Sequence, residues 1–165
     1  MMKNLSEKGQ AIVMVAFAVI GLVAFAALAI DGGRVFSDKR HSQNAADSAA
    51  MAVALAIARN PGFSTPAELQ SYVEATGWQS AETNGYDNDA ANADVIITLV
   101  RSPNNSCTYH GWDAEVKIVS TIDTTLARVV GRNQLTNVAT AWARYCDPVI
   151  LNGVVEKDAS ISLLK

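Results

Sequence analysis

An uninterrupted apolar stretch near the N-terminus, Ala11 to Ile30, constrains the fold of this chain more than any other feature. It contains no charged or strongly polar side chain, whereas charged residues are scattered through the rest of the sequence. Because about twenty helical residues rise roughly 30 Å, the stretch is long enough to cross the hydrocarbon core of a bilayer. We therefore expect residues 1–30 to form a cytoplasmic tip and a transmembrane helix.

A cleaved signal peptide is the main alternative for the same stretch. Lys3 and Lys8 provide a basic region before it, and Ala27-Leu28-Ala29 is a small-x-small cleavage pattern. Cleavage after Ala29 would release a secreted module instead of an anchored protein. A buried helix of a soluble protein fits less well, because the stretch has no polar face.

Two cysteines indicate the compartment of the remaining chain. Basic residues lie on both sides of the apolar stretch, so the positive-inside rule does not orient it. Cys107 and Cys146 are far apart and match no metal-binding spacing, so we expect them to form a disulfide in an oxidising compartment, with the N-terminus inside and the domain outside. Two reduced, buried thiols are the alternative.

Composition limits the function of this domain. The chain has 165 residues, so residues 31–165 suffice for one small domain beyond the anchor. The net charge of -3 provides no basic excess for neutralising phosphates, which argues against nucleic-acid binding.

A long helix is expected to lead the domain. Residues 34–58 contain neither proline nor glycine, and Ala45 to Ala58 is almost entirely small and aliphatic. Asp31-Gly32-Gly33 is a candidate helix break; if it is accommodated, one helix joins the span to residue 58. Small residues cover more of residues 45–58 than a thin sheet can bury, so we predict a partner contact there, tested at Ala49 and Ala52.

The remaining pattern predicts an α+β fold, with the long helix packed on a small antiparallel sheet in a pilin-like arrangement. A capping box beginning at Thr65 predicts a second helix to about Thr76, whose inner face carries Leu69, Tyr72, Val73 and Thr76. Gly77 to Asn92 is predicted to be a surface loop. Strands are predicted at 94–101, 114–122 and 135–146, and a short helix at 124–130 that ends at Gly131.

Several segments resemble the TadE/TadG-like proteins of bacterial Flp (Tad) pilus assembly. They are Gly9-Gln10-Ala11, Asp31-Gly32-Gly33-Arg34, Arg40, the run from Gln43 to Ala50 and the later segment Leu126 to Gly131. The candidate assembly residues on the helix are Asp31, Gly33, Arg34, Gln43, Ala45, Ala46, Asp47, Ala49 and Ala52.

The resemblance implies a non-enzymatic, minor pilin-like assembly protein without a cofactor or small-molecule substrate. Its expected location is the bacterial inner membrane, with the domain in the periplasm or at the cell surface, and its expected partners are the membrane and other pilus or envelope subunits, including copies of itself. A filament-forming subunit is an alternative. Gly9 and Gln10 mark a candidate processing site, but Met14 stands where cleaved prepilin-like members usually carry glutamate. Retention of the uncleaved chain is therefore also open.

Two polar segments resemble metal-binding motifs only in part. Asp158 to Ser162 fits D-x-S-x-S, but one loop supplies too few oxygen ligands, so a polar tail or edge strand is expected. Asp87-Asn88-Asp89 begins like a calcium loop but lacks the glycine and the final glutamate of an EF-hand. His41 and His110 have no paired ligand spacing, and no metal site is predicted.

Overall fold

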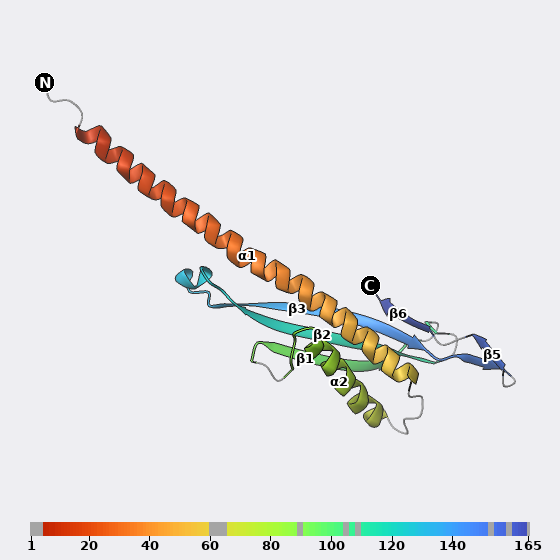
Figure 1. The fold of residues 1–165 in the computed structure, drawn as a ribbon. Coiled ribbons are helices and arrows are strands. Elements are labelled where there is room, and N and C mark those ends of the chain that lie inside the picture. Colours follow the sequence, from red (N-terminus) through yellow and green to blue (C-terminus); the bar gives the residue numbers. More distant parts are fainter. Residues whose placement is uncertain are drawn as a thin grey trace. The chain divides into compact units, whose positions relative to one another are not determined.

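The computed structural model describes residues 5–59, 66–88, 91–103, 106, 107, 110–151, 154–157 and 160–164 (Figure 1). Its helices are α1 (Leu5–Arg59), α2 (Pro66–Thr83) and the 3-10 helix η1 (Ala127–Val130). Its strands are β1 (Ala93–Arg101), β2 (Gly111–Asp123), β3 (Gln134–Cys146), β4 (Val149–Leu151), β5 (Val154–Lys157) and β6 (Ser160–Leu164).

A four-stranded antiparallel sheet with the order β1-β2-β3-β6 forms the centre of the α+β domain. The predicted α+β class is therefore confirmed, and so are strands at the three predicted positions. The sequence predicts a polar tail or edge strand at residues 158–162, and β6 covers residues 160–162 of that segment. It pairs with β3 from Cys146 opposite Ser160 to Trp142 opposite Leu164, which confirms an edge strand at the described residues.

The short hairpin formed by β4 and β5 was not predicted. Its strands have three and four residues, too few for a periodic pattern to stand out.

The contacts divide the chain into two units. One contains Met1–Phe36 with Ile122–Leu135, and the other contains Ser37–Thr121 with Thr136–Lys165. We refer to them as the anchor unit and the sheet unit. Helix α1 contributes residues to both.

Helix α1 continues through Asp31, Gly32 and Gly33, so the alternative of a single long helix is confirmed. The two glycines are exposed, and nothing lies within 4 Å of a Cβ built on either. Glycine weakens a helix by only about 1 kcal/mol relative to alanine, which the good helix formers on both sides offset.

Helix α2 continues to Thr83, so the prediction of a loop was wrong for residues 77–83. Gly77 is buried in close packing: a Cβ added there would lie only 2.3 Å from Ile97 Cδ1 and 3.0 Å from Val53 Cγ2. Close packing on β1 thus explains a helical glycine that local propensity argues against. The turn after the helix uses Gly85, whose φ of 87° suits glycine.

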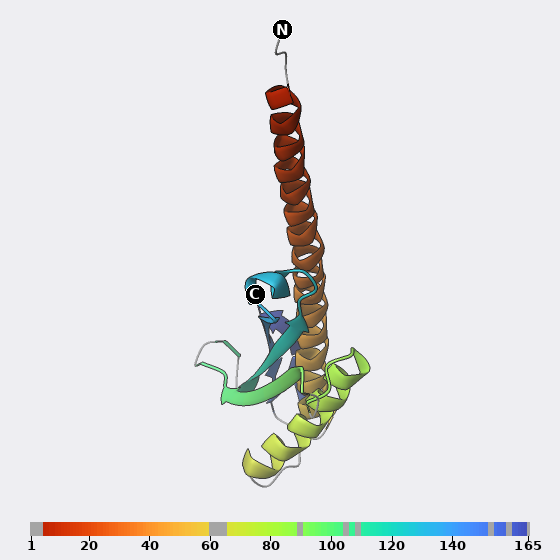
Figure 2. The same ribbon diagram turned by 90° about the vertical axis from the view of Figure 1, so that its left-hand side faces the viewer.

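Small and β-branched side chains form the core of the sheet unit. In Figures 1 and 2 the C-terminal part of α1 runs along the sheet, and α2 lies beside β1. From β2, Ala114, Val116 and Ile118 are fully buried, as their alternation with Glu115 and Lys117 predicts. From α2, Leu69 and Val73 are buried as predicted, whereas Tyr72 is 39% exposed.

Side chains occupy the outer edge of β1. Trp78 Nε1 donates to the Val95 carbonyl at 2.9 Å, and Gln70 Nε2 donates to the Ile97 carbonyl at 2.9 Å. Gln70 Oε1 accepts from the Leu99 N–H, and Asn88 Oδ1 accepts from the Val95 N–H. These backbone groups of an edge strand are therefore satisfied within the chain.

Candidate functional site

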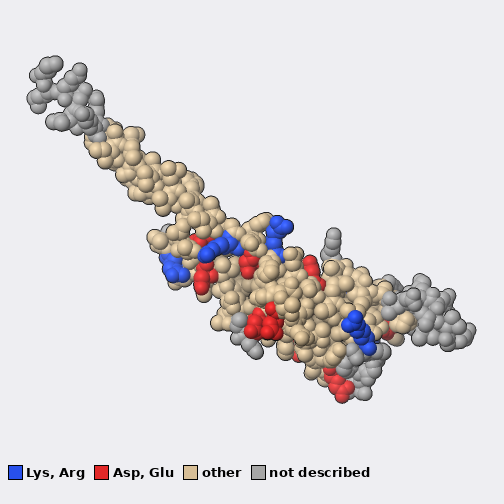
Figure 3. Space-filling view, viewed as in Figure 1, with Lys and Arg blue, Asp and Glu red and all other residues tan. Residues whose placement is uncertain are grey.

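The N-terminal half of α1 carries a continuous apolar surface. Its large side chains between Ile12 and Ile30 are each at least half exposed. Figure 3 shows this stretch without coloured charged atoms. Within the described residues, α1 alone has the length and composition to cross a membrane, and it lies near the N-terminus, where a signal sequence has the same properties.

Asp31, one residue beyond the apolar stretch, binds the start of η1. Its Oδ1 accepts from the Thr125 N–H at 2.9 Å, and its Oδ2 accepts from the Leu126 and Ala127 N–H groups at 3.0 and 2.6 Å. The side chain is buried, and the backbone donors, led by Ala127, hold the pKa of its carboxyl below the usual value. Asp31 thus caps η1 from a position far away in the sequence.

Arg34 strengthens the same attachment one helical turn later. Its Nη1 donates to Thr125 Oγ1 at 2.5 Å. Gly33 is exposed between these two residues and packs against nothing that the structure describes within 4 Å of a Cβ. Two of the three candidate residues at 31–34 therefore attach the loop after β2 to α1.

Asp38 makes the corresponding attachment in the sheet unit. Its Oδ2 accepts from Ser120 Oγ at 2.5 Å and from Asn137 Nδ2 at 2.9 Å, while its Oδ1 accepts from Tyr86 Oη at 3.0 Å. Burial, followed by the bond to Asp38, raises the pKa of Tyr86. One carboxylate therefore joins α1 to β2, β3 and the turn after α2.

This role of Asp38 was not predicted from the sequence. The available signal was its place on the helix, seven residues after Asp31 and seven before Ala45, which puts all three on one face. A carboxylate that continues an apolar face predicts a buried polar partner.

Gln43 and the alanines continue this contact surface along α1. Gln43 Nε2 donates to the Thr140 carbonyl of β3 and to Asp47 Oδ1, both at 3.1 Å. Ala45, Ala46 and Ala49 are completely buried. These candidate residues therefore hold α1 against the sheet of the same chain.

A narrower stripe of α1 stays exposed in the sheet unit. It consists of Asn44, Ser48, Met51 and Leu55, at the spacing of one helix face, and Met51 and Leu55 are 36% and 39% exposed. Ser48 Oγ lies 3.4 Å from Ser80 Oγ of α2. Ala52 is half-buried beside this stripe, unlike Ala49.

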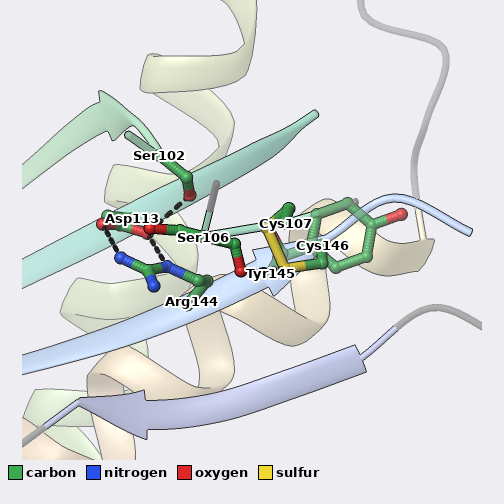
Figure 4. The surroundings of a disulfide bond; sticks show 7 residues. All are labelled: Ser102, Ser106, Cys107, Asp113, Arg144, Tyr145 and Cys146. Carbon is green, nitrogen blue, oxygen red and sulfur yellow. Dashed lines mark hydrogen bonds and ion pairs between the residues drawn. A yellow bond between two sulfur atoms is a disulfide. The ribbon is translucent and has the colours of Figure 1, made fainter. Parts of the chain in front are cut away.

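The predicted disulfide between Cys107 and Cys146 is present, with the two Cα atoms 5.4 Å apart (Figure 4). It ties the connection before β2 to the end of β3. Gly111 lies against it, because a Cβ there would meet Cys107 Sγ at 2.4 Å and the Tyr145 carbonyl oxygen at 2.6 Å.

An ion pair lies close to the disulfide. Arg144 Nε and Nη2 donate to the two Asp113 oxygens, both at 2.7 Å, and Ser102 Oγ donates to Oδ1 at 2.6 Å (Figure 4). Arg144 holds the pKa of the Asp113 carboxyl below its usual range. The arrangement links β2 and β3 to the residue that follows β1.

The two partial metal motifs do not form a described metal site. Among the described residues, no group of three or more His, Cys, Asp or Glu side chains lies close enough to hold an ion. Asp89 and Asp158 lie outside the described residues.

Comparison with known proteins agrees with the resemblance seen in the sequence. No curated protein and no solved structure matches the chain. Residues 9–56, which include the apolar stretch, Asp31, Gln43 and the buried alanines, match the family described as putative Flp pilus-assembly TadE/G-like, and the suspected family resemblance is thereby confirmed for this segment.

Proposed function

We propose that this chain is a membrane-anchored structural protein of a Tad (Flp) pilus-type system, minor pilin-like, with its disulfide-bonded domain outside the cytoplasm. The family match over residues 9–56 carries the proposal, because it falls on the helix that combines the apolar stretch with the attachments to the domain. The disulfide supports an oxidising compartment.

Two consecutive parts of the chain have different proposed roles. Residues 1–30 form the cytoplasmic tip and the span, and residues 31–165 form the domain led by residues 34–58 of α1. Asp31, Arg34, Gln43 and the buried alanines keep the helix bound to its own domain. Partner contact is then assigned to the exposed stripe, which we name the Met51 stripe: Asn44, Ser48, Met51 and Leu55.

Cell fractionation with intact mass spectrometry tests the anchor. The full-length chain is expected in membranes or shed filaments after high-salt and carbonate washing. A chain that begins at Gln10 and occurs in filaments would favour a processed filament subunit. A soluble chain that begins at Ile30 would refute the anchor and support a secreted module.

Charge substitutions on the Met51 stripe test the assembly role. Met51→Glu combined with Leu55→Glu should leave the fold intact, because both side chains are already partly exposed, but should abolish co-purification of envelope partners. Ile96→Glu on β1, where the side chain is 43% exposed, is the matched control. Unchanged co-purification of the double variant would refute this assignment.

Ala49→Leu separates folding from assembly. Its side chain is completely buried, so the added bulk should cost about 1 to 3 kcal/mol of folding stability. Thermal unfolding in detergent should show this loss even when no partner is present. An unchanged melting temperature would contradict the packing described for α1.

A further inference from the structure

The anchor unit carries an exposed apolar and cationic surface next to the end of the apolar stretch. Val129, in η1, is 86% exposed, more than any other large hydrophobic side chain described. Arg34, Arg128 and Arg132 are all exposed in the same unit. An apolar tip flanked by arginines is typical of segments that lie in a membrane interface.

The hydrogen bonds to Asp31 fix the position of this surface along the axis of α1, and therefore its depth relative to the membrane. The headgroup layer on each side of a bilayer is about 5 to 8 Å thick. If the hydrocarbon core ends at Ile30, residues 31–36 rise about 9 Å and cross that layer. Since Asp31 binds the N–H groups of residues 125–127 within 3.0 Å, η1 starts at the depth of the headgroups.

The charges of the anchor unit match an anionic surface. Beyond the span, its described residues contain three arginines against two acids, Asp31 and Asp123. The Asp31 carboxylate is buried and occupied by backbone donors, and Asp123 Oδ1 accepts from Gln134 Nε2 at 3.0 Å. Asp123 is nevertheless exposed, so the exposed charges are three arginines and one acid, and a guanidinium offers five N–H donors suited to phosphate.

We propose that η1 and its flanking arginines form an interfacial membrane contact, with Val129 inserted among the lipids and Arg128 and Arg132 bound to anionic phospholipid headgroups of the leaflet where the span ends. This inference rests on the proposed membrane anchor. Its consequence is that α1 crosses the interface together with a second segment, held at a defined depth by Asp31.

Depth-dependent quenching tests the inference in the full chain. Val129→Cys, Phe17→Cys and Val100→Cys variants are each labelled with an environment-sensitive fluorophore; the native cysteines are disulfide-bonded, so only the introduced thiol reacts. The protein is reconstituted in vesicles of equal parts phosphatidylcholine and phosphatidylglycerol that carry nitroxide lipids with shallow or deep labels.

The three labels have distinct expected results. The Phe17 label should be quenched by the deep nitroxide, the Val129 label by the shallow nitroxide, and the Val100 label, on β1, by neither. If the Phe17 label is quenched but the Val129 label is quenched no more than the Val100 label, the interfacial contact is refuted, whereas the membrane anchor is supported. No quenching of Phe17 would overturn the anchor and the inference with it.

Substitution of the arginines tests the headgroup part. A basic residue strengthens contact with an anionic surface about fivefold, so Arg128→Gln with Arg132→Gln should sharply reduce shallow quenching of the Val129 label in phosphatidylglycerol vesicles. The reduction in shallow quenching caused by the double substitution should be smaller in vesicles of phosphatidylcholine alone. Equal quenching of the parent and the double variant in phosphatidylglycerol vesicles would refute anionic headgroup binding.

Discussion

Replacing Asp38 with alanine should destabilise the sheet unit more than any exposed substitution on α1. The carboxylate accepts from Tyr86, Ser120 and Asn137, all of which are at least nine-tenths buried. A hydrogen bond to a charged group contributes about 1.5 to 3 kcal/mol, so three such bonds set an upper range of about 4.5 to 9 kcal/mol.

The expected net loss is smaller for three physical reasons. The Tyr86 hydroxyl retains the Asp38 carbonyl oxygen at 3.3 Å as a second acceptor, and the Ser120 hydroxyl can rotate. Removing a partly buried carboxylate also removes its desolvation cost. Alanine favours the helix over aspartate by roughly 0.5 kcal/mol. We therefore expect a loss of about 3 to 5 kcal/mol.

Thermal unfolding of the full chain in detergent, followed by near-ultraviolet circular dichroism, measures the effect. At about 2 to 4 °C per kcal/mol for a chain of this size, the midpoint should fall by roughly 6 to 20 °C. Lys39→Ala, an exposed neighbour, should change stability by no more than about 0.5 kcal/mol. If Asp38→Ala unfolds within about 1 kcal/mol of the parent, the attachment does not hold α1 on the sheet.

Three further predictions concern the end of the sheet near the disulfide. The bond between Cys107 and Cys146, with a sequence separation of 39, should contribute about 4 kcal/mol, measured by denaturant unfolding with and without reductant, and recovery of both alkylated thiols from the native protein would contradict it. Gly111→Ala should cost more than about 1 kcal/mol, because its Cβ would collide with a backbone oxygen; an unchanged denaturation midpoint would show that this site relaxes. Because the pKa of Asp113 is lowered in the folded state, its contribution to the free energy of unfolding is complete above about pH 4 and is lost as the pH falls through the folded-state pKa. The parent protein should therefore be more stable than the Asp113→Asn variant at neutral pH, and this difference in stability should decrease on acidification. A gap independent of pH would contradict the ion-pair explanation.

The elements that could be predicted from sequence are those whose signal is local. The alternation of Ala114, Val116 and Ile118 with charged residues predicts both strand β2 and its buried face, and a single pair of cysteines leaves one possible intramolecular disulfide. The apolar stretch and the helix after it have strong composition signals. Each of these inferences needs only neighbours in the chain or a count of residues.

The missed features depend on contacts between distant segments. Asp38 binds residues 48, 82 and 99 positions away, and no local pattern identifies such partners. Gly77 argues against a helix by propensity, yet packing against Ile97 and Val53 favours the small residue. The partner surface predicted at Ala49 and Ala52 also differs from the one now proposed, because packing in the sheet unit buries Ala49 and leaves Met51 exposed.

The side chains along the outer edge of β1 affect how this protein behaves when it is crowded with copies of itself. An unprotected edge strand can pair with the same edge of a neighbouring molecule and start aggregation. Here an incoming strand would first have to displace Gln70, Trp78 and Asn88 from four backbone groups. At high local concentration the chain is thereby protected from strand pairing with its own copies along this edge.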